Sequence, residues 1–350
     1  MKKLMLLIVL LCGGLDGAEV QTVSRMPEHV VAARPAVSAE GSPRNVILMI
    51  GDGMGAEHIS AAWLCNKGKL NITGLPYTGL CITCSANRAV TDSAAAGTAL
   101  AAGVKTNNGM VGQTPDRARP ESLAALFRAA GKATGLVVTK AITDATPAAF
   151  YAHTASRKNT AAIAEDLAGA GFDVLLGGGA AAFSREQMAQ MRDGGADVEL
   201  FAPGDCAPAS ERGELLVRCT RRALSRLEKA DKGFFLMVEG SSIDLAAHAN
   251  NLEETVREVL DFDRAVGAVL EWMQHHPDTL LVVTADHQTG GLSILDGDRK
   301  KGVVKGSFST TGHSGIAVPI YAIGVGASIF CGVMENTDVP RRIHGVTAQK

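Results

Sequence analysis

The chain has 350 residues, of which 46% are hydrophobic, and its 34 Lys and Arg residues nearly balance its 36 Asp and Glu residues. This length and apolar content allow a large buried core and exclude disorder as the main state. The net charge of −2 argues against a dedicated nucleic-acid partner, which needs a basic surface. Aromatic residues are only 4% while glycine reaches 39 of 350, which favours tight turns between Ala-rich helices over an aromatic-rich β-sandwich.

The first residues have the pattern of an export signal. Lys2 and Lys3 precede an eight-residue apolar run, residues 4–11, which is too short to span a bilayer. We therefore predict a signal peptide or lipoprotein signal over residues 1–17. The protein is then expected to be exported, either to the periplasm of a bacterium or as a membrane-anchored lipoprotein.

Cys12 follows the apolar run directly and is a candidate lipid anchor. Leu11 stands where a small residue is usual before such a cysteine, so ordinary signal-peptidase cleavage is the alternative. Residues 18–43 are rich in Ala, Val, Pro and Ser without sustained periodicity, which predicts a linker.

Six further cysteines follow Cys12, and an oxidising compartment would permit disulfides among them. Cys206 and Cys219 are close enough in sequence to form one. Cys81 and Cys84 have the spacing of a redox or zinc pair, but no second such pair completes a zinc site. Alternation of apolar residues at positions 80, 82 and 84 instead favours a packed strand.

Short apolar or β-branched runs alternate along the chain with Ala-rich segments of helical period, which predicts βαβ units. The expected strands are residues 46–50, 80–84, 135–139, 173–176, 234–238, 280–284 and 320–323. Their near-continuous apolar character predicts a three-layer α/β sandwich, with a central, mostly parallel sheet and helices on both faces. We assign residues 44–345 to a single catalytic domain with a peripheral excursion around residues 185–222.

Polar residues follow several of these strands, where an open α/β sheet binds its ligands. Seven residues of metal-ligand type lie at such ends or in nearby turns: Asp52, Glu239, Asp244, His248, Asp286, His287 and His313. Asp244 and His248 are spaced i,i+4, so on a helix they share one face. Each residue alone is more often structural, but together they predict a metal centre.

Ser93 begins an Ala-rich helical run for which Thr91 or Asp92 is a candidate cap. In the first helical turn, free N–H groups and the positive end of the helix dipole favour an anion, such as a serine alkoxide or a phosphate oxygen. A capping role for Ser93 is the alternative. No GxSxG motif is present, so activation of Ser93 by a metal fits better than activation by a histidine base.

Five motifs and the turn at His313 resemble the alkaline phosphatases, in family order over residues 45–325. The motifs are NVILMIGDGMG (45–55), VTDSAAAGTALAAGVKTNNG (90–109), DATPAAFYAHTASRK (144–158), FFLMVEGSSIDLAAHAN (234–250) and VVTADH (282–287). The resemblance implies hydrolysis of small phosphate monoesters through a phosphoserine at Ser93. It also implies two zinc ions and one magnesium ion.

The resemblance assigns the residues as follows: Asp52, Asp286 and His287 to the zinc that activates Ser93; Asp244, His248 and His313 to the other zinc; and Asp52, Thr146 and Glu239 to magnesium. Arg157 would clamp two phosphate oxygens, a task suited to its planar fork. Asp92 would orient Arg157, and Asp144 would lie beside the magnesium site.

Two features depart from the family pattern. Leu245 stands where some members carry a Lys or His that reaches the phosphate, which leaves metal preference and pH optimum open. Only 25 residues separate His287 from His313, where many relatives insert an interface segment, so the family's homodimer is an open alternative.

Other functions remain as alternatives. A phosphodiesterase or another metal-dependent hydrolase of the same superfamily could use the same ligands. A sulfatase is disfavoured because the residues after Ser93 do not follow the x-Pro-x-Arg pattern. A non-catalytic exported phosphate binder is the alternative from a different class.

Overall fold

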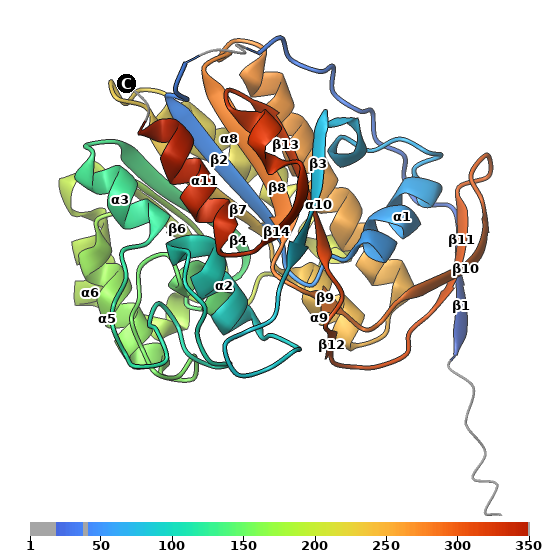
Figure 1. The fold of residues 1–350 in the computed structure, drawn as a ribbon, viewed down its shortest axis with the longest axis horizontal. Helices are drawn as coiled ribbons and strands as arrows, with labels where there is room; N and C mark the ends of the chain where they lie inside the picture. Colours follow the sequence, from blue (N-terminus) through green and yellow to red (C-terminus); the bar gives the residue numbers. More distant parts are fainter. Residues whose placement is uncertain (1–18, 38–40, 349–350) are drawn as a thin grey trace, which may run out of the picture.

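The computed structural model describes residues 19–37 and 41–348. Its centre is a nine-stranded sheet, shown in Figure 1. In spatial order its strands are β14 (Gly332–Glu335), β3 (Tyr77–Ile82), β13 (Val318–Gly324), β8 (Thr279–Ala285), β2 (Asn45–Gly51), β7 (Phe234–Gly240), β4 (Ala133–Ala141), β5 (Val174–Gly178) and β6 (Asp197–Leu200). All neighbouring pairs from β8 to β6 are parallel, whereas β13 runs antiparallel to both β8 and β3.

Helices cover both faces of this sheet (Figure 1). On one face, α8 (Leu215–Leu227) packs against α10 (Leu252–Met273), which also contacts α1 (Ala56–Cys65). The other face carries α2 (Ser93–Ala102), α3 (Leu123–Ala129) and α11 (Asp338–Thr347). Every residue of β2, β7 and β8 is buried, as expected for strands covered on both sides. The predicted three-layer α/β architecture is confirmed.

The other α-helices and strands of the described residues complete the fold. They are β1 (Val20–Val23), α4 (Ala145–Ala148), α5 (Thr160–Ala170), α6 (Arg185–Arg192), α7 (Ala209–Arg212), α9 (Ser242–His248), β9 (Gln288–Thr289), β10 (Ser293–Asp298), β11 (Val303–Ser307) and β12 (His313–Ser314). The predicted excursion around residues 185–222 contains α6, β6, α7 and the start of α8. Because β6 pairs with β5, part of this excursion extends the main sheet. The division into domains stays a prediction.

The segment expected to be a linker, residues 18–43, contains a strand and makes contacts with the core in its described part. Residues Val20–Val23 form β1, which pairs with β11. Further on, His29 Nε2 lies 2.6 Å from Asp263 Oδ2, and the backbone N–H of Ala32 donates to Asn71 Oδ1. The buried polar side chains of Asp263 and Asn71 thus supply partners that hold the segment against the core. The predicted signal over residues 1–17 and the candidate lipid anchor Cys12 lie outside the described residues.

Strand β3 corrects two sequence expectations. It ends at Ile82, before Cys84, and its core-facing residue is Cys81, while Leu80 and Ile82 are 43% and 36% exposed. Pairing with β13 and β14 sets this orientation. The sequence leaves it open, because apolar residues occupy both the odd and the even positions of this run.

The six cysteines among the described residues are free thiols, so the expected Cys206–Cys219 disulfide is not formed. Both of those thiols are buried as small apolar groups.

Within the described part of the chain, no helix combines the length and apolar character needed to cross a membrane.

Candidate metal and phosphate site

The strand register brings the predicted ligands together. Gly51 at the end of β2 pairs with Gly240 of β7 on one side and Ala285 of β8 on the other. Asp52 therefore leaves the sheet between Glu239 and Asp286, which lie at the ends of those two neighbouring strands. Carboxylates from three separate segments meet at one edge because parallel strands end together there.

Gly53 makes this close approach possible. It adopts a left-handed φ of 73°, and a Cβ there would lie 2.7 Å from Thr289 Oγ1 and 3.0 Å from Asp244 Oδ1. Its backbone N–H donates to Asp286 Oδ1 at 3.0 Å. The Asp-Gly turn after β2 therefore both packs against the ligand residues and orients one of them.

Asp244, His248 and His313 form one group whose ligand atoms all lie within 4.8 Å of one another. Helix α9 carries Asp244 and His248 on one face, with Nε2 of His248 3.3 Å from Asp244 Oδ1. His248 Nδ1 lies 2.5 Å from the Thr311 carbonyl and His313 Nδ1 lies 2.9 Å from the Thr91 carbonyl. These contacts orient each ring through Nδ1 and place both Nε2 atoms beside Asp244; in a neutral ring whose Nδ1–H donates to the carbonyl, Nε2 carries the lone pair that binds a metal ion.

The two Nε2 atoms of His248 and His313 lie 3.1 Å apart. Two lone pairs beside one carboxylate repel each other unless a cation lies between them. His and carboxylate ligands in this number suit zinc. The donor set therefore fits the first of the expected metal ions.

A second group lies next to the first and contains Asp52, Asp244 and His287 within 4.8 Å. Asp286 belongs beside it, because its Oδ2 lies 3.1 Å from His287 Nε2. Asp286 Oδ1 already accepts from two backbone N–H groups, whereas its Oδ2 has no hydrogen-bond partner among the described residues. Burial raises the pKa of Asp286 to about 6 and lowers that of His287 well below its usual value.

Asp52, Thr146 and Glu239 form the third expected set. Both carboxylate oxygens of Asp52 and Glu239, and the Thr146 hydroxyl, are buried without a hydrogen-bond partner in the described part of the chain. Burial and the charge of Asp144 raise the pKa of Glu239 to about 8. Burial, Asp286 and Asp244 raise the pKa of Asp52 well above its usual value. The ligand atoms of this set are all oxygens, and its buried carboxylates are stabilised in their charged form by a nearby cation. Such a set suits magnesium.

Ser93 lies at the first position of α2, and its hydroxyl is 3.2 Å from His287 Nε2. The helix cap is Asp92, whose Oδ1 accepts from the backbone N–H of Ala95 at 3.0 Å. This settles the alternative left open by the sequence: Ser93 is not the cap. Its hydroxyl is directed to the metal-type ligands, at the positive end of a ten-residue helix.

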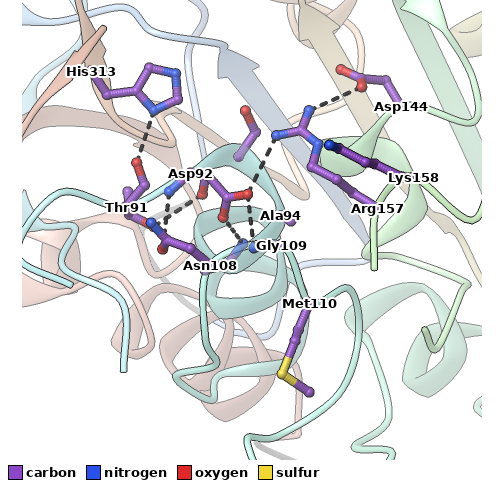
Figure 2. Close-up of polar contacts among 12 residues, drawn as sticks. Thr91, Asp92, Ala94, Asn108, Gly109, Met110, Asp144, Arg157, Lys158 and His313 are labelled. Carbon is purple, nitrogen blue, oxygen red and sulfur yellow. Dashed lines mark hydrogen bonds and ion pairs between the residues drawn. The ribbon is translucent and has the colours of Figure 1, made fainter. Parts of the chain in front are cut away.

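Arg157 is held between two carboxylates, as Figure 2 shows. Its Nη2 lies 3.1 Å from Asp144 Oδ1 and its Nη1 lies 3.6 Å from Asp92 Oδ2. Asp92 Oδ2 also accepts from the backbone N–H of Gly109 at 2.9 Å. Asp92 therefore caps α2 and orients the guanidinium at the same time, which places Arg157 near Ser93.

The structure adds two residues that the sequence did not single out. Thr289 donates its hydroxyl to Asp244 Oδ1 at 2.5 Å. Lys140, at the end of β4, places Nζ 2.8 Å from Asp144 Oδ2 and 3.9 Å from Asp52 Oδ2. Burial by itself lowers the pKa of Lys140, but the charges of Asp52 and Asp144 outweigh burial and raise it. The sequence signal that could have identified Lys140 is a lysine within an apolar strand, four residues before Asp144.

Contacts and chain adjacency link ten of the residues singled out from the sequence: Asp52, Asp92, Ser93, Asp144, Arg157, Asp244, His248, Asp286, His287 and His313. Glu239 lies on the strand next to β2, and Thr146 follows Asp144 by two residues with its hydroxyl buried. They offer side chains that suit hard and borderline cations, a hydroxyl that can act as a nucleophile and a guanidinium that can bind an anion through two N–H groups. Such a combination can bind a phosphoryl group and displace one of its oxygens in line. Leu245, beside Asp244, is 43% exposed and brings no charge to the site.

Comparisons with known proteins agree with this chemistry. The family model described as alkaline phosphatase matches residues 43–199 and 197–308. "Alkaline phosphatase 4" of Bacillus subtilis is 33% identical over 94% of this chain and 93% of its own, and the alkaline phosphatase of Escherichia coli is 30% identical over 89% and 87%. The solved alkaline phosphatase of the Antarctic bacterium TAB5 superposes with a TM-score of 0.83 and 32% identity, over 89% of this chain and 99% of its own.

Proposed function

Because the chain belongs to the alkaline phosphatase family and is a phosphatase, we propose that it hydrolyses phosphate monoesters through a phosphoserine at Ser93, using two zinc ions and one magnesium ion. The observation that carries this proposal is the position of the Ser93 hydroxyl, 3.2 Å from His287 Nε2 and next to two adjoining ligand groups. Asp52, Asp286 and His287 would hold the zinc beside Ser93. Asp244, His248 and His313 would hold the second zinc, and Asp52, Thr146 and Glu239 the magnesium.

The bound cations would lower the pKa of the Ser93 hydroxyl and of water, and would neutralise charge on the attacking and leaving oxygens. Ser93 attacks phosphorus, the ester oxygen leaves, and water then cleaves the Ser93–phosphate bond to release inorganic phosphate. The N-terminal turn of α2 directs its positive end at the phosphorylated hydroxyl. Asp244 raises the pKa of His248, and it outweighs burial to raise that of His313, whereas burial lowers the pKa of His287. All three rings would be neutral with metal ions bound, because the coordinating nitrogens cannot then carry a proton.

Arg157 supports a monoester as the substrate. Its fork can bind two charged, non-bridging oxygens, which a monoester dianion offers and a diester lacks. Asp144 and Asp92 hold the guanidinium in place before substrate arrives, so little conformational entropy is lost on binding. A phosphodiesterase with the same metal ligands would gain less from this clamp.

Arg157→Ala should therefore weaken inhibition by inorganic phosphate and lower kcat/KM for a monoester, each by about 10- to 100-fold, because the metal ligands remain. Competitive inhibition by phosphate is the measurement. Lys158→Ala is the matched control: it removes the neighbouring cation, for which no contact with the clamp is found among the described residues. Unchanged phosphate inhibition in Arg157→Ala would contradict the clamp.

The test of the proposed function is hydrolysis of a chromogenic phosphate monoester, compared with the matching diester and sulfate ester at alkaline pH. Monoester turnover should exceed the other two, disappear with a chelator and return with zinc plus magnesium. Preference for the diester or the sulfate would place the protein elsewhere in the superfamily. A metal-loaded protein without turnover would favour the non-catalytic phosphate binder.

We also propose that the enzyme acts after export, as the N-terminal signal pattern and Cys12 indicate. A Cys12→Ser variant expressed in a bacterial host should move from the membrane fraction to the soluble fraction if Cys12 carries a lipid. Small phosphate monoesters are the only partners that the proposal requires.

A further inference from the structure

Lys140 is a buried cation in an otherwise apolar strand. The residue is 8% exposed, and the seven interior residues of β4 are all buried. A lysine in such a position is costly unless its ammonium is paired, because burial removes its hydration. We therefore expect negatively charged groups close to its Nζ atom.

Those groups are Asp144 and one member of the third metal set, Asp52. The ammonium lies 2.8 Å from Asp144 Oδ2 and 3.9 Å from Asp52 Oδ2, and Asp52 is the carboxylate that this set shares with a zinc. On the neighbouring strand, Glu239 pairs with Val138, two residues before Lys140. The Lys140 charge opposes the burial and the Asp144 charge that raise the pKa of Glu239, so the ammonium also interacts with that carboxylate.

Asp144 links this ammonium to the phosphate clamp. Its Oδ2 faces Lys140 and its Oδ1 faces Arg157 at 3.1 Å, so both of its oxygens have cationic neighbours. Asp144 is therefore neutralised within the protein. Asp52 is different, because its contacts are longer: Oδ2 lies 3.9 Å from the Lys140 ammonium and Oδ1 lies 3.5 Å from His287 Nε2, which leaves both oxygens able to take a metal ion.

A divalent ion held by Asp52, Thr146 and Glu239 would lie within a few ångströms of the ammonium. A positive charge at that distance, in a buried site, repels the ion strongly even at a high effective dielectric constant. Magnesium also keeps several bound waters, which donate hydrogen bonds to nearby carboxylates. The Lys140 ammonium competes with these waters for the same carboxylates.

We propose that the Lys140 ammonium is a permanent positive charge beside the third metal set. It interacts with the Asp52 carboxylate, which the magnesium ion also binds, and thereby weakens magnesium binding. The two zinc sets then fill at much lower metal concentration than the third. Lys140 acts here through Asp52 and Asp144 and is a positioning residue. This inference rests on the proposed function, since it presumes the three metal sets.

The test measures magnesium binding directly. Protein loaded with two equivalents of zinc is dialysed against a series of free Mg²⁺ concentrations at fixed salt and pH, and bound metal is counted by inductively coupled plasma mass spectrometry. Lys140→Met removes the charge while keeping the length of the side chain, Lys140→Gln is a second neutral variant, and Lys140→Arg keeps the charge. Lys132→Met is the matched control: Lys132 precedes the opposite end of β4, where its ammonium donates to the carbonyls of Arg44 and Lys232.

We expect both neutral variants to bind one magnesium with a dissociation constant at least about tenfold lower than that of the wild type. Lys140→Arg and Lys132→Met should bind it as weakly as the wild type. Equal or weaker binding in the neutral variants, or tight binding in Lys140→Arg, overturns the proposal.

Wild-type protein provides a test that needs no folded variant. If it retains a full equivalent of magnesium together with zinc after gel filtration in metal-free buffer, the proposal is wrong. Monoester turnover by the same wild-type sample is recorded separately. Absence of turnover would count against the proposed function, while the comparison of magnesium affinities would still report on Lys140.

Discussion

Replacing Ser93 by alanine should abolish the phosphorylated enzyme and lower kcat/KM for a phosphate monoester by at least about 10⁴-fold, as expected when a nucleophile is removed. The ligand groups stay intact, so metal content should not change. Because Asp92, and not Ser93, caps α2, the melting temperature should also remain close to that of the wild type.

The measurement is trapping of labelled phosphate on the protein by acid quench, together with the burst of alcohol product. Ser184→Ala is the matched control, because Ser184 is a true cap: its hydroxyl accepts from the backbone N–H of Gln187 at 3.2 Å, on α6. That variant should lose about 1 kcal/mol of stability and keep its phosphoenzyme. An undiminished burst in Ser93→Ala would rule out Ser93 as the nucleophile.

Replacing Asp52 by asparagine should be nearly as severe, because Asp52 belongs to two of the three expected ligand sets. We expect loss of at least one metal ion per chain and a fall in kcat/KM of about 10³-fold or more. Metal content by mass spectrometry and turnover at saturating zinc and magnesium are the measurements.

The same variant should have the opposite effect on the metal-free protein. Burial, Asp286 and Asp244 raise the pKa of Asp52, so the folded metal-free protein binds this proton more tightly than the unfolded chain does. That contribution to stability is fully present below the unfolded pKa and is lost as the pH rises through the folded pKa. An asparagine side chain cannot ionise, so in the presence of a chelator Asp52→Asn should melt at a higher temperature than the wild type, by more at pH 8 than at pH 5. An unchanged or lower melting temperature at pH 8 would show that the carboxylate is not under this electrostatic strain.

Much of the site could be predicted from the sequence because its chemistry is local. Ser93 precedes a strong helix-forming run, and the structure places it at the first position of α2. Asp244 and His248 have helical spacing and share a face of α9. The apolar runs that predicted seven strands correspond to β2, β3, β4, β5, β7, β8 and β13.

What the sequence missed depends on contacts between distant residues. Lys140 looked like one polar residue in a strand, and only its distances to Asp52 and Asp144 show that its ammonium faces those two carboxylates. The segment around His29 resembled a linker because the buried Asp263 that binds it lies 234 residues away. Local composition carries no information about such a partner.

The sequence by itself therefore determined the α/β class, and its motifs singled out the candidate nucleophile, clamp and metal ligands, because strand and helix periodicity and short motifs are properties of local segments. Only the tertiary structure decided which face of β3 enters the core, that Asp92 both caps α2 and orients Arg157, and that Lys140 faces Asp52. Each of these depends on strand register or on packing between segments far apart in the chain, and such long-range contacts form only when the whole core assembles.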